Sequence, residues 1–157
     1  MFCSRELDKL SLIECKESSL DGIETSDNLQ CLYISHNRAL RDIEALYKIK
    51  DTLKALRIVN CPKILDFSVL SELNNLELLE ISGSNTLESL IFIKKLNNLK
   101  YLVFDVNIAD GDLTPCLNLS YVQCKKTKRH YSHKDQELPK GVFIRGNENI
   151  EDWRKLE

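Results

Sequence analysis

A cysteine and two histidines near the C-terminal end are the side chains best suited to bind a metal. Cys124, His130 and His133 lie close together in the sequence, and two acidic residues follow them. Thiolates, imidazoles and carboxylates are the usual ligands of zinc. The spacing matches no recognised ligand pattern, however, and the chain has no C-x-x-C pair. We therefore expect no metal site, and interpret the stretch as a polar turn in which Tyr131 packs and the histidines are solvated.

Sequence motifs for catalysis are missing from the chain. It contains no G-x-S-x-G, P-loop, G-x-G-x-x-G or H-E-x-x-H motif, and it has only three histidines. We expect no catalytic residues, no cofactor and no small-molecule substrate. An enzyme built on the region of His130 and His133 is an alternative that this expectation sets aside.

Charge and cysteine usage narrow the choice of partner and location. The formal net charge is −2, with acids and bases mixed along the chain, which favours neither a nucleic acid nor a membrane as partner. The basic stretch KKTKRHYSHK lacks interleaved stacking aromatics, so we interpret it as a solvated surface or a patch that meets an acidic partner. Charged residues at positions 5, 6, 8 and 9 stand where a signal peptide would be apolar. We expect a cytoplasmic protein whose six cysteines are mostly small buried residues rather than disulfides.

The elements that position these side chains follow a repeating pattern, which is clearest in residues 76–98. This stretch opens with Leu76, Leu79 and Ile81, and continues with apolar residues at steps of three. The alternation of side chains between two faces at the start of this stretch predicts a short strand. The apolar residues at every third position after it predict a short 3-10 or helical return segment. Such a unit cannot bury its own apolar edge, so it requires similar units on both sides.

Similar units occupy most of the chain. Six strand signatures occur at offsets of 22, 24, 23, 23 and 20 residues, and they begin at Leu7, Leu29, Leu53, Leu76, Leu99 and Leu119. The ninth position of each unit is small and polar or a thiol, and it reads Cys15, Asn37, Cys61, Ser84, Asn107 and Thr127. Each of these side chains can hydrogen-bond a backbone group at an internal corner.

The pattern resembles the leucine-rich repeat family, whose consensus is L-x-x-L-x-L-x-x-N/C-x-x-L at 20–29 residues per repeat. The unit length and the triplet-spaced return segment look most like the short bacterial type found in internalins. The resemblance implies an α/β solenoid over residues 1–127, with about six short parallel strands on a concave face and 3-10 or short helical segments on the convex side. It also implies that the ninth positions form an internal ladder.

Residues 128–157 depart from the repeat and are expected to form a C-terminal cap of the same domain. Pro139 and Gly141 predict a turn, and residues 141–146 predict a short edge strand. Apolar residues at helical spacing in 149–157 predict a helix, with Trp153 as the main apolar plug. The closing stretch also looks like that of small bacterial leucine-rich repeat proteins, some of which are immunity proteins encoded beside polymorphic toxins.

Strand alternation places every second side chain of each unit on the concave sheet face. Leu78, Tyr101, Val103 and Tyr121 would form an apolar patch on adjacent strands, edged by charged residues. Aromatic and arginine anchors inside a polar rim describe an interface better than an active site. The expected partner-binding residues are Tyr33, Arg57, Leu78, Glu80, Tyr101, Val103, Asp105, Tyr121, Gln123 and Lys125.

These expectations combine into a protein-binding module without catalytic activity. The most concrete form, implied by the resemblance, is a bacterial immunity protein that binds and neutralises a cognate toxin domain. The alternative is a scaffold or adaptor leucine-rich repeat protein within a larger assembly. Either role requires a protein partner.

Overall fold

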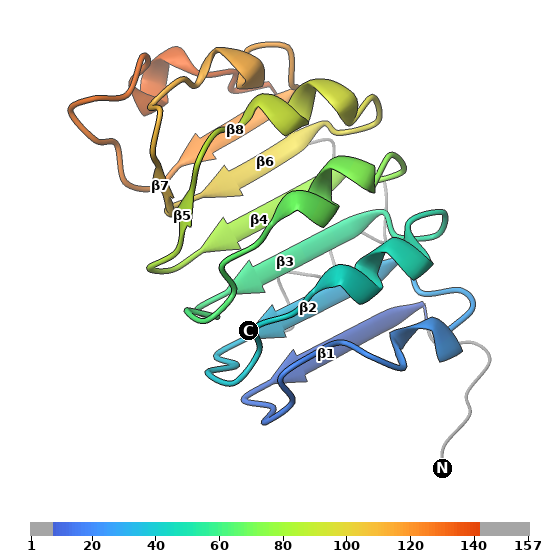
Figure 1. Ribbon diagram of the computed structural model, residues 1–157. Coiled ribbons are helices and arrows are strands. Elements are labelled where there is room, and N and C mark those ends of the chain that lie inside the picture. Colours follow the sequence, from blue (N-terminus) through green and yellow to red (C-terminus); the bar gives the residue numbers. More distant parts are fainter. Residues whose placement is uncertain (1–7, 142–157) are drawn as a thin grey trace.

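The computed structural model describes residues 8–141 and contains a six-stranded parallel sheet (Figure 1). The strands lie side by side in chain order and are β1 (Lys9–Ile13), β2 (Cys31–Ser35), β3 (Ala55–Val59), β4 (Leu78–Ser82), β6 (Tyr101–Phe104) and β8 (Tyr121–Cys124). A second sheet pairs β5 (Thr86–Leu87) with β7 (Asn107–Ile108), also in parallel. The prediction of about six short parallel strands is confirmed, and the mixture of strands and short helices is compatible with the α/β class.

Short 3-10 helices connect successive strands and cover one face of the six-stranded sheet (Figure 1). They are η1 (Ile23–Thr25), η2 (Glu44–Ile49), η3 (Ser68–Glu72), η4 (Ile91–Lys95), η5 (Thr114–Cys116) and, after the last strand, η6 (Asp135–Glu137). Within residues 8–141, no helix combines the length and the apolar character needed to cross a bilayer. We call the opposite face of the sheet, which points away from η1–η5, the outer sheet face.

The main core lies between the sheet and these helices. Register pairs Leu32 with Leu56 and Leu56 with Leu79, and all three side chains are fully buried. They alternate along each strand with side chains on the outer sheet face. The spacing of apolar residues in the return segments places Leu70 of η3 and Ile93 of η4 in the same core. Each unit buries its two sides against the units before and after it, and this burial stabilises the fold.

Sharp corners end the first three strands in the same way. Glu14, His36 and Asn60 each adopt a left-handed backbone conformation, with φ of 53°, 54° and 53°. At each corner the backbone N–H donates to a carbonyl of the next strand over, and the three N···O distances are 2.8–2.9 Å. The corner after β4 uses Gly83 instead, with φ of 135°, a value that favours glycine.

Buried asparagines satisfy backbone groups behind two of these corners. Asn37 accepts hydrogen bonds from the N–H groups of residues 39 and 40, and Asn85 donates to the carbonyls of Cys61 and Ile64 at 3.0 and 2.8 Å. The prediction of Ser84 for this internal position is wrong, since Ser84 is exposed and Asn85 is buried. Gly83 adds a residue to the corner and shifts the internal position by one.

The residues at the ninth position of the last two units also differ from the prediction. Asn107 is half-buried in β7, while its neighbours Val106 and Ile108 are fully buried, and Thr127 is exposed. Tyr131 takes over the polar role there, because its hydroxyl accepts from the Ile108 N–H and donates to the Val106 carbonyl, both at 3.1 Å. The expected packing of Tyr131 is thus confirmed.

Tyr131 and Leu138 close the C-terminal end of the described core, with exposures of 9% and 3%. Residues 139–141 run beside β8, where the Val122 N–H donates to the Pro139 carbonyl at 2.8 Å. The predicted edge strand over 141–146, apart from residue 141, the predicted helix over 149–157 and its plug Trp153 lie outside the described residues. The domain boundary expected at residue 127 stays a prediction.

Replacing Tyr131 by phenylalanine is expected to lower the free energy of unfolding by about 1–3 kcal/mol, because it leaves the buried N–H of Ile108 and carbonyl of Val106 without their partner. The matched control is Tyr47→Phe on η2, where the ring is 49% exposed and the change should stay within about 0.5 kcal/mol. Urea denaturation of both variants measures the difference. Equal losses would contradict the role assigned to Tyr131.

Candidate functional site

The candidate site occupies the outer sheet face, where strand register aligns side chains in rows across the sheet. One row contains Cys31, Ala55, Leu78, Tyr101 and Tyr121, and the next contains Tyr33, Arg57, Glu80, Val103 and Gln123. A third row begins with Ser35, Val59 and Ser82, and Asp105 and Lys125 follow directly after β6 and β8. This arrangement confirms that the predicted residues within the strands lie on one face of the sheet.

The expected exposure of this face is wrong for about half of the predicted residues. Leu78 and Tyr101 retain only 7% and 6% of their surface, and Tyr33, Arg57 and Glu80 are also buried. The apolar row packs against itself across neighbouring strands, where Cys31 and Ala55 join Leu78 and Tyr101 in a second cluster that Tyr121 borders. Strand alternation fixes which face a side chain occupies but not how tightly that face packs.

The accessible part of the predicted site lies toward β6 and β8. Val103, Asp105, Tyr121 and Gln123 are half-buried, and Lys125 is exposed. The Lys140 ammonium lies 5.5 Å from the centre of the Tyr121 ring. A partner that approaches this end therefore meets aromatic, amide and charged groups within a small area.

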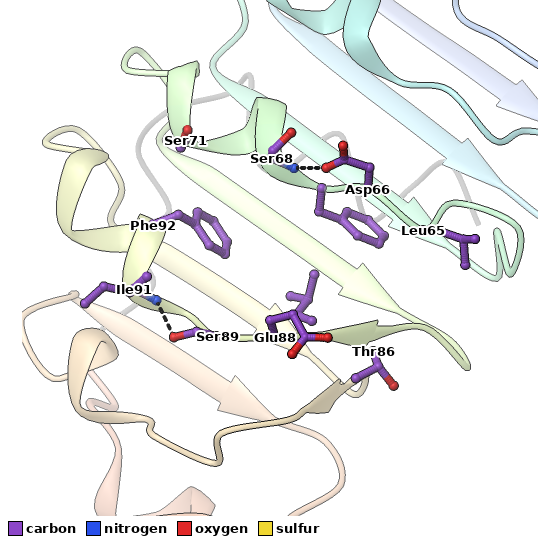
Figure 2. Close-up of a pocket in the computed structure, with 11 residues that line it drawn as sticks. Leu65, Asp66, Ser68, Ser71, Thr86, Glu88, Ser89, Ile91 and Phe92 are labelled. Carbon is purple, nitrogen blue, oxygen red and sulfur yellow. Dashed lines mark hydrogen bonds between the residues drawn. The ribbon is translucent and has the colours of Figure 1, made fainter.

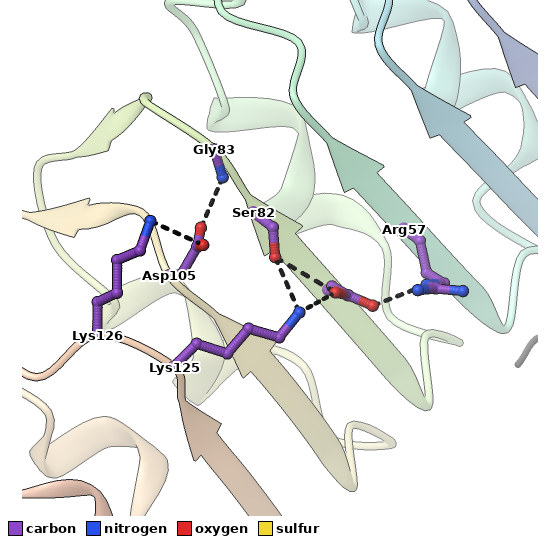
Figure 3. Close-up of polar contacts among 7 residues, drawn as sticks. Arg57, Ser82, Gly83, Asp105, Lys125 and Lys126 are labelled. Atoms are coloured by element: carbon purple, nitrogen blue, oxygen red, sulfur yellow. Dashed lines mark hydrogen bonds and ion pairs between the residues drawn. The ribbon is translucent and has the colours of Figure 1, made fainter. Parts of the chain in front are cut away.

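A buried carboxylate organises the charged groups of the face (Figure 3). Glu80 on β4 accepts from Nε of Arg57 at 2.7 Å and from Nζ of Lys125 at 2.8 Å. The Ser82 hydroxyl lies 3.3 Å from the same Glu80 oxygen that binds Lys125. On the other side, the Arg57 guanidinium lies 4.8 Å from the centre of the Tyr33 ring, a cation–π contact. The residues therefore form a chain of contacts that links β2, β3 and β4 to the segment after β8.

The electrostatic balance of this network keeps Glu80 ionised. Burial alone would raise the pKa of the Glu80 carboxyl, but the hydrogen bond from Lys125 and the positive charges of Arg57 and Lys125 outweigh burial and lower it. The side chains of Glu80 and Arg57 are 9% and 10% exposed, whereas that of Lys125 is 39% exposed. Lys125 can thus exchange its contact with Glu80 for a contact with a partner more readily than Arg57 can.

A second ion pair continues the network to the corner after β4. Asp105 lies 3.3 Å from the Lys126 ammonium and accepts a hydrogen bond from the Gly83 N–H at 2.6 Å (Figure 3). Ser82, Gly83 and Lys126 were not among the predicted site residues. The basic stretch after β8 pointed to Lys126, but nothing in the sequence indicated that Gly83 would place an N–H against Asp105.

The arrangement is suited to recognition rather than proton transfer. Glu80 accepts from two cationic groups, so its basicity is reduced. Three cationic groups face two carboxylates, which leaves one net positive charge at the edge near Lys125 and Lys126. That charge is compatible with an acidic group on a partner.

The histidine and cysteine residues considered for a metal site have other surroundings. His130 Nε2 lies 2.9 Å from the Ile108 carbonyl, and His133 Nδ1 lies 2.8 Å from the Ser132 hydroxyl. Burial raises the pKa of the Cys124 thiol, and it raises that of Cys116 to about 12, so both thiols are protonated at neutral pH. Within the described range 8–141, no group of three or more potential ligands could hold a metal ion.

Comparison of the chain with protein-family models found no match, and comparison with curated proteins found none either. The function is therefore inferred from the repeat pattern and from the residues of the outer sheet face.

Proposed function

We propose that the protein is a leucine-rich repeat solenoid that binds another protein through the outer sheet face. The repeat offsets of the sequence and the chain-order parallel sheet support the class. The observation that carries the binding role is the Arg57–Glu80–Lys125 network beside accessible Tyr121. Buried ion pairs contribute little net stability compared with apolar packing, so a specificity role is a reasonable explanation for their presence here.

The most concrete form of the proposal is a cytoplasmic bacterial immunity protein that binds and neutralises a cognate toxin. Its support is the resemblance of the C-terminal stretch to small leucine-rich repeat proteins encoded beside toxins. In this proposal Tyr121, Val103 and Gln123 supply contact area, and Lys125 and Lys126 attract an acidic partner surface. No substrate, cofactor or catalytic residue takes part.

A scaffold or adaptor role is the second candidate. It is favoured by exposed apolar side chains on the opposite, helical side of the chain, where Leu65 and Ile91 are 88% and 55% exposed. A scaffold uses more than one surface, whereas neutralisation of a toxin requires one. Expression of the captured partner alone and together with this protein separates the two, because only a toxin partner is harmful alone and harmless in the pair.

Replacing Tyr121 by alanine is expected to weaken partner binding by at least about 2 kcal/mol, in the range of interface hot spots. The half-buried ring offers a large, rigid contact area at low entropy cost. A partner captured from the native host and identified by mass spectrometry provides the ligand, and surface plasmon resonance measures its affinity. Lys126→Ala should mainly slow association, since it removes an exposed rim charge.

Lys94→Ala and Lys95→Ala on η4 are the matched controls, because both side chains are exposed on the helical side. They should leave the affinity unchanged. If Tyr121→Ala binds like the wild type while a lysine on η4 proves essential, the proposed binding face is wrong.

A further inference from the structure

An apolar groove lies on the helical side of the chain, away from the outer sheet face. It runs between η3 and η4 with their preceding loops (Figure 2). Leu87 of β5 is a buried part of its wall. Phe67 and Phe92 flank it, and Leu65 and Ile91 are two of the most exposed large apolar side chains among residues 8–141. Exposed apolar groups that gather along one groove mark an interaction site more often than isolated ones do.

Within the described residues, the groove borders a short strand, β5, that is paired on one side only. β5 pairs with β7 of the next unit on one side. In the third unit the corresponding stretch begins with Pro62, which has no N–H to donate. Within the described residues, β5 and β7 form a sheet of two strands only, so the other edge of β5 has no strand partner.

The charged side chains that line the groove are negative. Asp66 and Glu88 line it, and an adjoining groove between η2 and η3, which shares Ser68 and Ser71, is lined by Asp21, Asp42, Glu44 and Glu72. Among residues 8–141, Lys48 is the only cationic residue that lines either groove, and it is paired with Glu24 at 3.0 Å. A hydrogen bond from the Ser68 N–H lowers the pKa of the Asp66 carboxyl, which is therefore ionised at neutral pH.

We propose that this groove binds an extended, cationic segment of a partner protein. The segment adds a short strand to the open edge of β5, as peptides do at other exposed sheet edges. Alternate side chains of the segment are apolar and pack against Leu65, Phe92 and Ile91, while its lysine or arginine side chains meet Asp66 and Glu88. This surface is separate from the outer sheet face and does not depend on the function proposed for it.

Selection of random phage-displayed peptides on the full chain tests the proposal. Peptides that alternate apolar residues with lysine or arginine should be enriched, and a synthetic copy should shift the amide resonances of Leu65 and residues 86–88 in an NMR titration. Leu65→Lys and Glu88→Lys should each weaken binding of that peptide at least about tenfold through charge repulsion. Both side chains are exposed, so neither change should disturb folding.

Leu117→Lys is the matched control for the leucine substitution, since Leu117 is 38% exposed and does not line either groove. It should leave peptide affinity unchanged. The proposal fails if no peptides are enriched, if the enriched peptides are acidic or uncharged, or if their affinity is insensitive to Leu65→Lys and Glu88→Lys. A concentration-dependent dimer that Leu65→Lys dissolves would also overturn it, because the occupant would then be a second copy of this chain.

Discussion

Replacing Glu80 by alanine is expected to lower the free energy of unfolding by about 3–5 kcal/mol, although the residue lies on the outer sheet face. The substitution leaves the Arg57 guanidinium, whose side chain is 10% exposed, without the carboxylate that pairs with it at 2.7 Å. It also removes the partner of Lys125. Removal of one member of a buried ion pair is costly because the remaining charge stays desolvated.

Urea denaturation at neutral pH measures this loss, and Glu88→Ala is the matched control. Glu88 is exposed in the segment that includes β5, so the same change there should fall within about 0.5 kcal/mol. Alternation along β4 alone would have placed Glu80 in solvent and predicted an equally small loss of stability for Glu80→Ala and Glu88→Ala. A loss for Glu80→Ala no larger than the control would show that the substitution leaves no desolvated charge at Arg57.

The pH dependence of stability provides an independent measurement on the same residue. The folded-state pKa of Glu80 is depressed below its ordinary value of 4.5, so its stabilising contribution is present above that value and is lost as pH falls through the folded-state pKa. Glu80→Gln cannot ionise and lacks this contribution. The difference in stability between the wild type and Glu80→Gln should therefore shrink as the pH is lowered from 7 toward about 3. A constant difference would indicate that ionisation of Glu80 is irrelevant to stability.

Replacing Leu79 by alanine is expected to destabilise the fold by about 2–5 kcal/mol. Leu79 is fully buried at the centre of the sheet, between Leu56 of β3 and Leu102 of β6, so truncation leaves a cavity with neighbours on both sides. The matched control is the identical substitution at Leu65, which is 88% exposed and should change stability by no more than about 0.5 kcal/mol.

Denaturant titrations of Leu79→Ala and its control Leu65→Ala also test the register of β4 described above against a register shifted by one residue. A shift by one residue would move the whole buried set to the outer face, because successive side chains point to opposite faces. Similar losses for Leu79→Ala and for its outward neighbour Leu78→Ala would not decide the register, since Leu78 is also buried. An unaltered midpoint for Leu79→Ala would rule out the register described here.

The sequence-based predictions were correct for features that follow from the spacing of apolar residues along the chain. The repeated opening, with apolar residues at its first, fourth and sixth positions, predicted six strands, and the alternation within it predicted which residues share the outer sheet face. A period assigns a face but carries no information about packing on it. For that reason the burial of Tyr101, Leu78 and Glu80 could not be read from the pattern.

The errors at the corners have a different cause. Ser84 and Asn85 are both small and polar, so the chemistry of the ninth position fits either one. The choice depends on the backbone path through Gly83, whose φ of 135° accommodates one extra residue. The role of Tyr131 was predicted only in part, because the hydrogen bonds of its hydroxyl depend on where a later segment crosses the end of the core.

The chain-order arrangement of the six strands has a consequence for how the protein folds. Paired strands are separated by only 20–24 residues, from the pair of Lys9 with Cys31 to that of Tyr101 with Tyr121. Each pairing therefore closes a loop of similar, modest length, and none has to wait for distant parts of the chain to meet. Once any interior pair has formed, every later strand docks onto an existing edge. Folding can thus begin at several places along the chain and spread outward in both directions, as expected when contacts are local in sequence.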